Sequence, residues 1–411
     1  MSSSNKSERY YALDALRGIM MLLGIVIHAA AFYGVSSPIA FHDESRSGAF
    51  DHLAAFIHAF RMPVFFVMAG FFASLLYGRR GAKGMILNRV NRVLIPLVVS
   101  WLILYPLTVA SFIVVRSAPA SPWLSNLMEY FRTGHSFVNQ GTHLWYLYHE
   151  DWSHLWFLYY LLIFYAFALG LAQAARWFPQ PLQNRISLVL RKALESSWRP
   201  LIFALVTVLT TYPSQGIIRT DASFVPDPLS LLGYGVFFGF GWVLFGHREL
   251  LITFQRHAWA LTFAGVLCFL LRRRIVGIVS HVLPEPEAVA LLLNITMLSL
   301  VPWLFIFGLT GLFIRYLNRP TPLIRYLSDA SYWIYLVHPP VLVWLAWLLA
   351  PVPISAVSTF LLLLLSALPI LVLTYHYGVR STFIGEFLNG RRYYRPIPNR
   401  SAEEAAAVTG T

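Results

Sequence analysis

Three ionisable residues interrupt the first long apolar stretch of the sequence, residues 13–32, which reads LDALRGIMMLLGIVIHAAAF. Asp14 and Arg17 are three residues apart, so a helix places them on one face, where they can pair. A further eleven residues, almost three turns, bring the His28 imidazole back to that face, about 16 Å along the axis. Ionisable groups in such an apolar helix are costly and usually face a functional cavity. The spacing therefore predicts a titratable ring beside a cavity.

A structural interpretation of the same residues is also open. The histidine could hydrogen-bond a neighbouring helix, and the arginine could extend its charged end to the cytoplasm. Met21 and Gly24 lie between the two residues on the same stripe of the helix. Because the charge pair, the glycine gap and the imidazole share one face, we favour function for Arg17 and His28 together.

Two more basic side chains lie in the second apolar stretch, FIHAFRMPVFFVMAGFFAS. His58 and Arg61 are one helical turn apart in its outer half. Because a guanidinium keeps its charge, Arg61 needs an anion or water beside it. The structural alternative is an acidic neighbour such as Asp51 or Glu44, and the functional alternative is a substrate anion.

Three further candidate substrate contacts lie in later apolar stretches. SHLWFLYYLL places His154 and Trp156 at the outer entry of a helix, where aromatic side chains often form an interfacial belt. LSDASYWIYLVHPP places His338 near the middle of another helix. There it can contact a substrate or hydrogen-bond a neighbouring helix.

On the inner side of the predicted helices, RVNR places Arg89 and Arg92 one turn apart at a helix start. Two guanidiniums that point the same way suit a phosphate group, because each presents a fork of donors to its oxygens. Most other basic residues nearby are interpreted as determinants of membrane topology.

The segment 116–153 is rich in aromatic rings, which suit either sugar faces or anchoring at the membrane interface. It also contains His143, His149 and Glu150, whose spacing fits no recognised zinc pattern, and we assign no metal site. The single cysteine, Cys268, excludes an internal disulfide.

Composition places all these residues in a membrane protein. Of the 411 residues, 57% are hydrophobic and 12% are charged, and the mean hydropathy is +0.61. Stretches of about 20 apolar residues can cross a bilayer as helices, whereas a membrane barrel has shorter alternating segments. We expect an all-α polytopic protein with about ten transmembrane helices. The predicted spans are 14–34, 52–77, 93–115, 154–174, 199–213, 229–246, 257–271, 287–314, 329–350 and 354–377.

Lys and Arg residues set the expected orientation. With both termini in the cytoplasm, the inner segments hold 22 of the 31 basic residues and the outer loops hold seven. We expect a cytoplasmic segment over 1–12, a membrane domain over 13–380 and a partly disordered cytoplasmic tail over 381–411. The net charge of +13 then faces anionic lipid, and nothing in the basic residues indicates nucleic acid binding.

Two features fit this layout less well. Arg272–Arg274 fall on the outer side, unless the seventh span is a re-entrant segment. The chain also begins with Lys6 and Arg9, an apolar stretch and AAA at 29–31, as a signal peptide does. The ionisable residues of the first helix disfavour that interpretation.

The motifs resemble those of the membrane-bound acyltransferase-3 family. That family has an Arg, ten residues and then a His in its opening helix, matched here by Arg17 and His28. RVNR is similar to its Arg-x-x-Arg element at the third span, and SYWIYLVHPP to its late-helix pattern, which ends at His338. FIHAFRMPVFFVMAGFFAS, SHLWFL and the ten-span layout are most similar to those members that succinylate osmoregulated periplasmic glucans.

The resemblance implies an enzyme of the bacterial inner membrane with the acyltransferase-3 fold. It implies transfer of a succinyl group from cytoplasmic succinyl-CoA to glucan hydroxyls outside. Succinyl-CoA is then a co-substrate, and no cofactor is permanently bound. The implied partners are acyl-CoA, the periplasmic glucan, the lipid bilayer and other glucan-biosynthesis proteins.

The positions read from the residues fit such a task. Arg89 and Arg92 would hold the nucleotide, and the long thin arm of the donor would pass Gly24 and bring its thioester beside His28. His28 is expected to act as a general base, because an imidazole titrates near neutral pH, and an acyl-histidine intermediate is ranked second. Arg17 would line the inner passage.

Further roles follow for the remaining residues. Asp14 would steady Arg17, and Arg61 or the Arg272–Arg274 group would hold the free carboxylate that distinguishes succinyl from acetyl. His58, His154, Trp156 and His338 are expected to contact the acyl group or the glucan.

Three other functions remain open at this point. One is O-acetylation of another surface or exported polysaccharide by the same fold. Another is a multi-span transporter that uses Arg17 and His28 as a proton or anion relay. The third is a scaffold for glucan export without catalysis.

Overall fold

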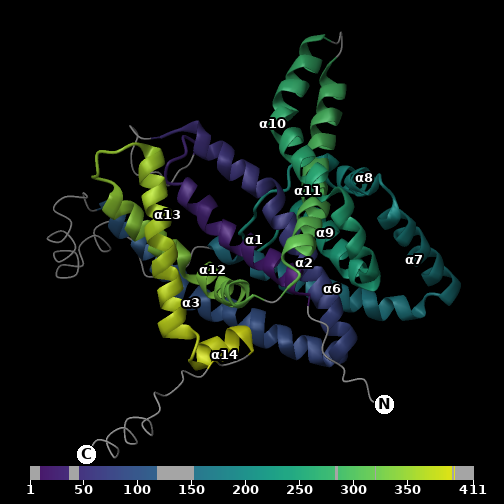
Figure 1. The fold of residues 1–411 in the computed structure, drawn as a ribbon, viewed down its shortest axis with the longest axis horizontal. Coiled ribbons are helices and arrows are strands. Elements are labelled where there is room, and N and C mark those ends of the chain that lie inside the picture. Colours follow the sequence, from purple (N-terminus) through teal and green to yellow (C-terminus); the bar gives the residue numbers. More distant parts are fainter. Residues whose placement is uncertain are drawn as a thin grey trace, which may run out of the picture.

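The chain folds into a helical bundle in this computed structural model (Figure 1). The structure describes residues 10–36, 46–117, 152–282, 286–319, 321–390 and 393. These described residues contain helices and connecting turns and no strand, as the composition predicts.

The α-helices follow the apolar stretches of the sequence. They are α1 (Tyr11–Ala30), α2 (Gly48–Arg89), α3 (Ile95–Ser117), α6 (Trp156–Ala174), α7 (Gln180–Glu195), α8 (Arg199–Thr211), α9 (Pro228–Gly246), α10 (Ala258–Val282), α11 (Pro286–Tyr316), α12 (Pro322–Leu349), α13 (Ala356–Leu373) and α14 (Phe383–Asn389). Short 3-10 and π-helical turns join several of them, including η1 (Val90–Leu94), η3 (Ser153–Leu155), η6 (Arg248–His257) and η7 (Thr374–Val379).

Each of the ten predicted spans coincides with helix. Among the described residues, seven helical runs are long and apolar enough to cross a membrane, and the longest joins α2, η1 and α3. The fifth and seventh predicted spans correspond to α8 and α10, which are not among those seven runs. The protein is a multi-pass membrane protein, while the count of ten and the orientation stay predictions.

Helix α1 lies in the middle of the bundle, in contact with α2, α11, α12 and α13 (Figure 1). Its small and apolar residues, from Ala12 to Ala30, are largely buried against these neighbours. Most of α1 is therefore enclosed by other helices.

Helix α2 bends at Gly81, where φ is +67°. Side chains other than glycine rarely adopt this left-handed conformation, so glycine suits the bend. Beyond it, the helix passes through the π-helical turn η1 into α3. Such turns often occur at functional sites, and this one carries Arg92.

Helices α2 and α9 cross at two glycines. A Cβ on Gly241 would lie 1.9 Å from the Val67 carbonyl oxygen, and one on Gly70 would lie 2.0 Å from the Phe238 carbonyl oxygen. Small residues let membrane helices approach closely where lipid offers no hydrophobic drive for association. This crossing fixes α2, and with it Arg61, relative to the rest of the bundle.

Two parts of the expected layout can be described in the structure. The seventh span corresponds to one uninterrupted helix, α10, which forms a projecting hairpin with α11 (Figure 1). Arg272 lies within this hairpin and donates a hydrogen bond to Asn294. The predicted boundary at residue 380 falls just before α14, which contributes Leu388 and Asn389 to the cavity described below.

Candidate functional site

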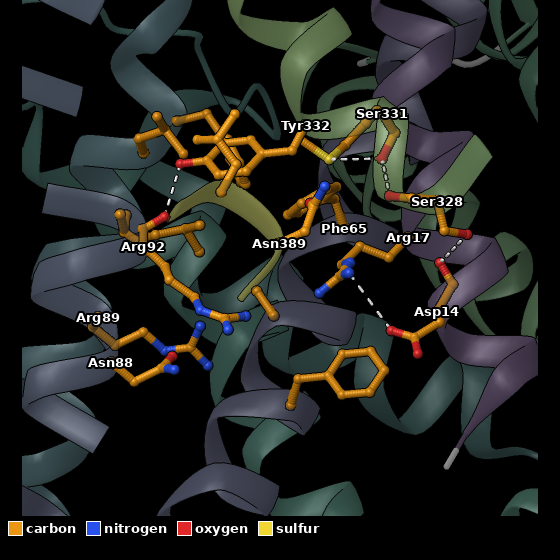
Figure 2. Close-up of a pocket in the computed structure, with 18 of the residues that line it drawn as sticks. Asp14, Arg17, Phe65, Asn88, Arg89, Arg92, Ser328, Ser331, Tyr332 and Asn389 are labelled. Atoms are coloured by element: carbon orange, nitrogen blue, oxygen red, sulfur yellow. Dashed lines mark hydrogen bonds and ion pairs between the residues drawn. The ribbon is translucent and has the colours of Figure 1, made fainter. Parts of the chain in front are cut away.

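A cavity of about 330 Å³ lies at the end of the bundle where α1 begins. Its polar lining includes Asp14, Arg17, Arg89, Arg92, Ser331 and Asn389. Figure 2 shows the guanidinium groups of the three arginines pointing into one space. Residues predicted from two separate stretches of sequence therefore line the same cavity.

Asp14 and Arg17 form the ion pair that their spacing predicts, with 3.5 Å between Oδ1 and Nη2. The Arg17 guanidinium also lies 5.3 Å from the centre of the Phe72 ring. The Ser328 hydroxyl of α12 donates a hydrogen bond of 3.4 Å to the Asp14 carbonyl oxygen. These contacts hold α1 against α12, while Arg17 keeps 38% of its side chain exposed at the cavity.

Arg89 and Arg92 lie on either side of the junction between α2 and η1. The Arg89 guanidinium lies 4.5 Å from the centre of the Tyr165 ring, and the Tyr332 hydroxyl donates a 2.9 Å hydrogen bond to the Arg92 carbonyl. At Gly390, φ is +69° and a Cβ would collide with the Arg92 guanidinium. The end of α14 therefore packs directly against Arg92, which the sequence motif did not indicate.

The charges in the cavity favour an anion. Three guanidiniums face two carboxylates, those of Asp14 and Asp329. The Tyr393 hydroxyl donates a 2.8 Å hydrogen bond to Asp329, so this carboxylate already has a partner. A partly enclosed, net positive cavity of this kind suits phosphate oxygens, which accept several charge-assisted hydrogen bonds.

Three imidazoles gather beyond this cavity, from α1, η3 and α12, and we call them the histidine cluster. The ring centres of His28 and His338 are 5.0 Å apart, and those of His154 and His338 are 5.5 Å apart. His338 and His154 are buried, whereas His28 is only partly buried. Tertiary packing thus joins three predicted residues that are far apart in the sequence.

Backbone carbonyls fix the tautomers of two of these rings. His338 Nδ1 donates to the Tyr335 carbonyl at 2.7 Å, and His154 Nε2 donates to the Leu336 carbonyl at 3.1 Å. The opposite nitrogens, His338 Nε2 and His154 Nδ1, are buried and have no hydrogen-bond partner among the described residues. In neutral imidazoles these nitrogens are acceptors, so the cluster can receive hydroxyl donors.

The cavity corresponds to the inner part of the expected passage. The cavity reaches Met21 and Ser331, and seven residues, or about 10 Å of helix rise, separate these from His28 and His338. Tyr335 lies between Ser331 and His338 on α12, and sequence reasoning did not single it out.

Tyr335 is held firmly in this intermediate position. Its hydroxyl donates a 2.6 Å hydrogen bond to the His154 carbonyl, and its ring centre is 6.0 Å from that of Phe157. Its side chain is buried. Tyr335 therefore occupies part of the space between the cavity and the histidine cluster.

Arg61 and His58 lie on α2 near the histidine cluster, and Arg61 forms no ion pair with Asp51. Asp51 accepts hydrogen bonds from the amides of Val35 (2.9 Å) and Ser36 (3.3 Å), so its proposed pairing with Arg61 is wrong. His58 Nε2 lies 2.9 Å from the Thr220 hydroxyl. Glu44 lies outside the described residues.

Trp156 differs from its expected place. It is buried, with its ring centre 5.2 Å from that of Tyr160 and 5.5 Å from that of Tyr234, so the interfacial-belt interpretation is wrong. The aromatic loop residues and the three candidate zinc ligands within 118–151 lie outside the described residues. The remaining predicted contacts, His154 and His338, are members of the histidine cluster.

Comparison with known proteins agrees with the motifs. The profile of the acyltransferase-3 domain family, described as an acyltransferase domain, matches residues 10–376. Proteins named glucans biosynthesis protein C from Salmonella gallinarum and Salmonella paratyphi B are each 28% identical over 406 residues, or 95% of this chain and 97% of theirs. The protein of that name from Salmonella schwarzengrund is 27% identical over 407 residues, with the same coverage.

No solved structure matches this chain significantly. The family profile nevertheless covers most of the sequence, including α1, the Arg89–Arg92 element and His338, and the resemblance predicted from the motifs is confirmed. The chain therefore belongs to the acyltransferase-3 family of membrane acyltransferases.

Proposed function

We propose that the protein transfers a succinyl group from cytoplasmic succinyl-CoA to hydroxyls of osmoregulated periplasmic glucans across the bacterial inner membrane. The observation that carries this proposal is a positive cavity and a histidine cluster on one face of α1. The names of the relatives support a glucan as the acceptor.

The donor would bind with its nucleotide in the cavity. Arg89, Arg92 and Arg17 supply the positive charge that its phosphates need. Helix α14 also lines the cavity, through Leu388 and Asn389. The arm of the donor is long and weakly polar, so it suits the apolar wall that includes Phe65, Phe157 and Leu158. A movement of Tyr335 or its neighbours would let the thioester continue to His28.

His28 would act as the general base. It accepts the proton of a glucan hydroxyl as that oxygen attacks the thioester carbonyl, and a tetrahedral oxyanion forms. The carbon–sulfur bond then breaks, the carbonyl is restored, and the departing CoA sulfur takes the proton from His28. The acceptor nitrogens of His338 and His154 would orient the sugar hydroxyls.

Purified protein incubated with labelled succinyl-CoA or acetyl-CoA and periplasmic glucan tests the proposal. We expect a succinyl ester on the glucan with wild type, and a loss of about 10²- to 10⁴-fold in His28→Ala, the range of general-base catalysis. His257→Ala is the matched control, because His257 is exposed on η6, away from the cavity.

Each of the three competing functions predicts a different experimental result. Transfer of acetyl in preference to succinyl would assign the chain to O-acetylation. Solute flux without acyl-CoA turnover would assign it to transport. Full export of glucan by cells that carry only His28→Ala, with no esters formed by either protein, would indicate a scaffold.

A further inference from the structure

Arg61 fills the space that a side chain at position 24 would occupy. A Cβ on Gly24 would lie 3.1 Å from Arg61 Nη1 and 3.5 Å from its Cζ and Nη2 atoms. The guanidinium of α2 therefore lies directly against α1 at Gly24. Because His28 follows Gly24 by one turn, and helical side chains lean toward the N-terminus, the guanidinium and the imidazole lie at similar depth.

No carboxylate balances this guanidinium among the described residues. Asp14 pairs with Arg17, and Asp51 accepts hydrogen bonds from backbone amides. The titratable side chains that interact with Arg61 are Tyr234, Tyr335, His28, His58 and His338, none of which carries negative charge at neutral pH. A charged arginine between membrane helices without an anionic partner costs free energy. We therefore expect an anion to bind beside Arg61 during function.

We propose that Arg61 is a catalytic residue that stabilises the oxyanion of the tetrahedral intermediate. This inference rests on the proposed acyl transfer. As the acceptor oxygen bonds to the carbonyl carbon, the pair of electrons of the carbonyl moves onto its oxygen, and the fixed Nη donors of Arg61 meet that charge. When the carbon–sulfur bond breaks, the charge returns from the oxygen and leaves with sulfur.

The location of Arg61 favours the oxyanion over the carboxylate of a succinyl group. The reacting carbonyl must lie beside the His28 base, and the guanidinium lies within one helical turn of that base. The distal carboxylate of a succinyl chain lies two methylene groups further from the carbonyl carbon. A hydrogen-bond donor fixed at the depth of the base can stabilise the negative charge on the reacting oxygen. Fixed positive charge at that oxygen accelerates the reaction.

The test compares Arg61→Gln and Arg61→Lys with wild type, using succinyl-CoA and acetyl-CoA in parallel with saturating glucan. We expect Arg61→Gln to lower kcat by about 10²- to 10³-fold with whichever of these donors wild type accepts, as removal of an oxyanion donor does, with KM changed little. Arg61→Lys retains the charge without the fork and should recover part of the loss. Arg256→Gln, at an exposed site on η6, is the control.

The possible results distinguish an oxyanion role of Arg61 from a carboxylate-binding role, and both from a failure of the proposed function. A loss confined to succinyl-CoA and expressed in KM would assign Arg61 to the acyl carboxylate and overturn the oxyanion role, as would an unchanged kcat in Arg61→Gln. No turnover by wild type with either donor would refute the proposed function itself. The thermal midpoint shows whether Arg61→Gln folds. If it does not, Gly24→Ala is used instead, because it moves the guanidinium without removing it. An unchanged kcat in Gly24→Ala also overturns the oxyanion role of Arg61.

Discussion

Replacing Gly24 with alanine would separate the stability of α1 from the position of Arg61. The new Cβ would lie 3.1 Å from Nη1, which is shorter than an ordinary contact of 3.4–4 Å. The obstructing atoms belong to the flexible end of a side chain, so the guanidinium would shift by some tenths of an ångström. Since a misplacement of about 1 Å can cost about 10²-fold in rate, we expect kcat to fall about 5- to 50-fold.

Stability should change in the opposite direction. Alanine is the better helix former by about 1 kcal/mol, and only the movable end of Arg61 opposes the new methyl group. The thermal midpoint of Gly24→Ala should therefore equal or exceed that of wild type. Gly170→Ala in α6 is the matched control, because a Cβ there meets no atom within 4 Å, and its kcat should be unchanged.

The assay is ester formation on glucan from labelled succinyl-CoA, with thermal midpoints measured in the same detergent. A Gly24→Ala protein with wild-type kcat would show that the placement of Arg61 does not matter to the reaction. A fall in kcat accompanied by a lower midpoint would instead indicate a packing defect, and the reasoning would be refuted.

Three other predictions concern the cavity and the fold. Arg89→Gln should raise KM for succinyl-CoA about 10- to 100-fold in initial-rate measurements, because a charged hydrogen bond is worth about 1.5–3 kcal/mol; a lower kcat at unchanged KM would contradict a nucleotide-binding role. Gly241→Val should abolish the monodisperse protein in size-exclusion chromatography, since its side chain would overlap the Val67 carbonyl, and a wild-type elution profile would contradict the tight crossing. Asp227→Ala should cost about 0.5–2 kcal/mol at pH 7, because Asp227 caps α9. The Ser230 hydroxyl holds the pKa of Asp227 below its ordinary value of 3.8, so this stabilisation is present at neutral pH and is lost as the pH falls through the folded-state pKa. The difference in thermal midpoint between wild type and Asp227→Ala should narrow below about pH 4. A constant difference would exclude a capping role of the charged carboxylate.

The helices and the family could be predicted from the sequence because both depend on local patterns. Apolar runs of membrane length dictate helices wherever they occur, since every backbone polar group must be satisfied within lipid. The Arg17–His28 spacing and the Asp14–Arg17 pair depend only on the helical period, and the pair is present as predicted. The short helix α14 escaped prediction because seven residues carry too little periodic signal.

Contacts between helices depended on packing that local patterns do not encode. The gathering of His28, His154 and His338, the filling of the gap at Gly24 by Arg61, and the burial of Trp156 follow from how α1, α2, α6 and α12 cross. Those crossings are set by small-residue contacts such as that of α2 with α9. The sequence by itself therefore determined which long apolar helices form and which face of α1 is polar. Only the tertiary structure decided which side chains meet on that face, because distances across a bundle are fixed by packing rather than by spacing along one chain.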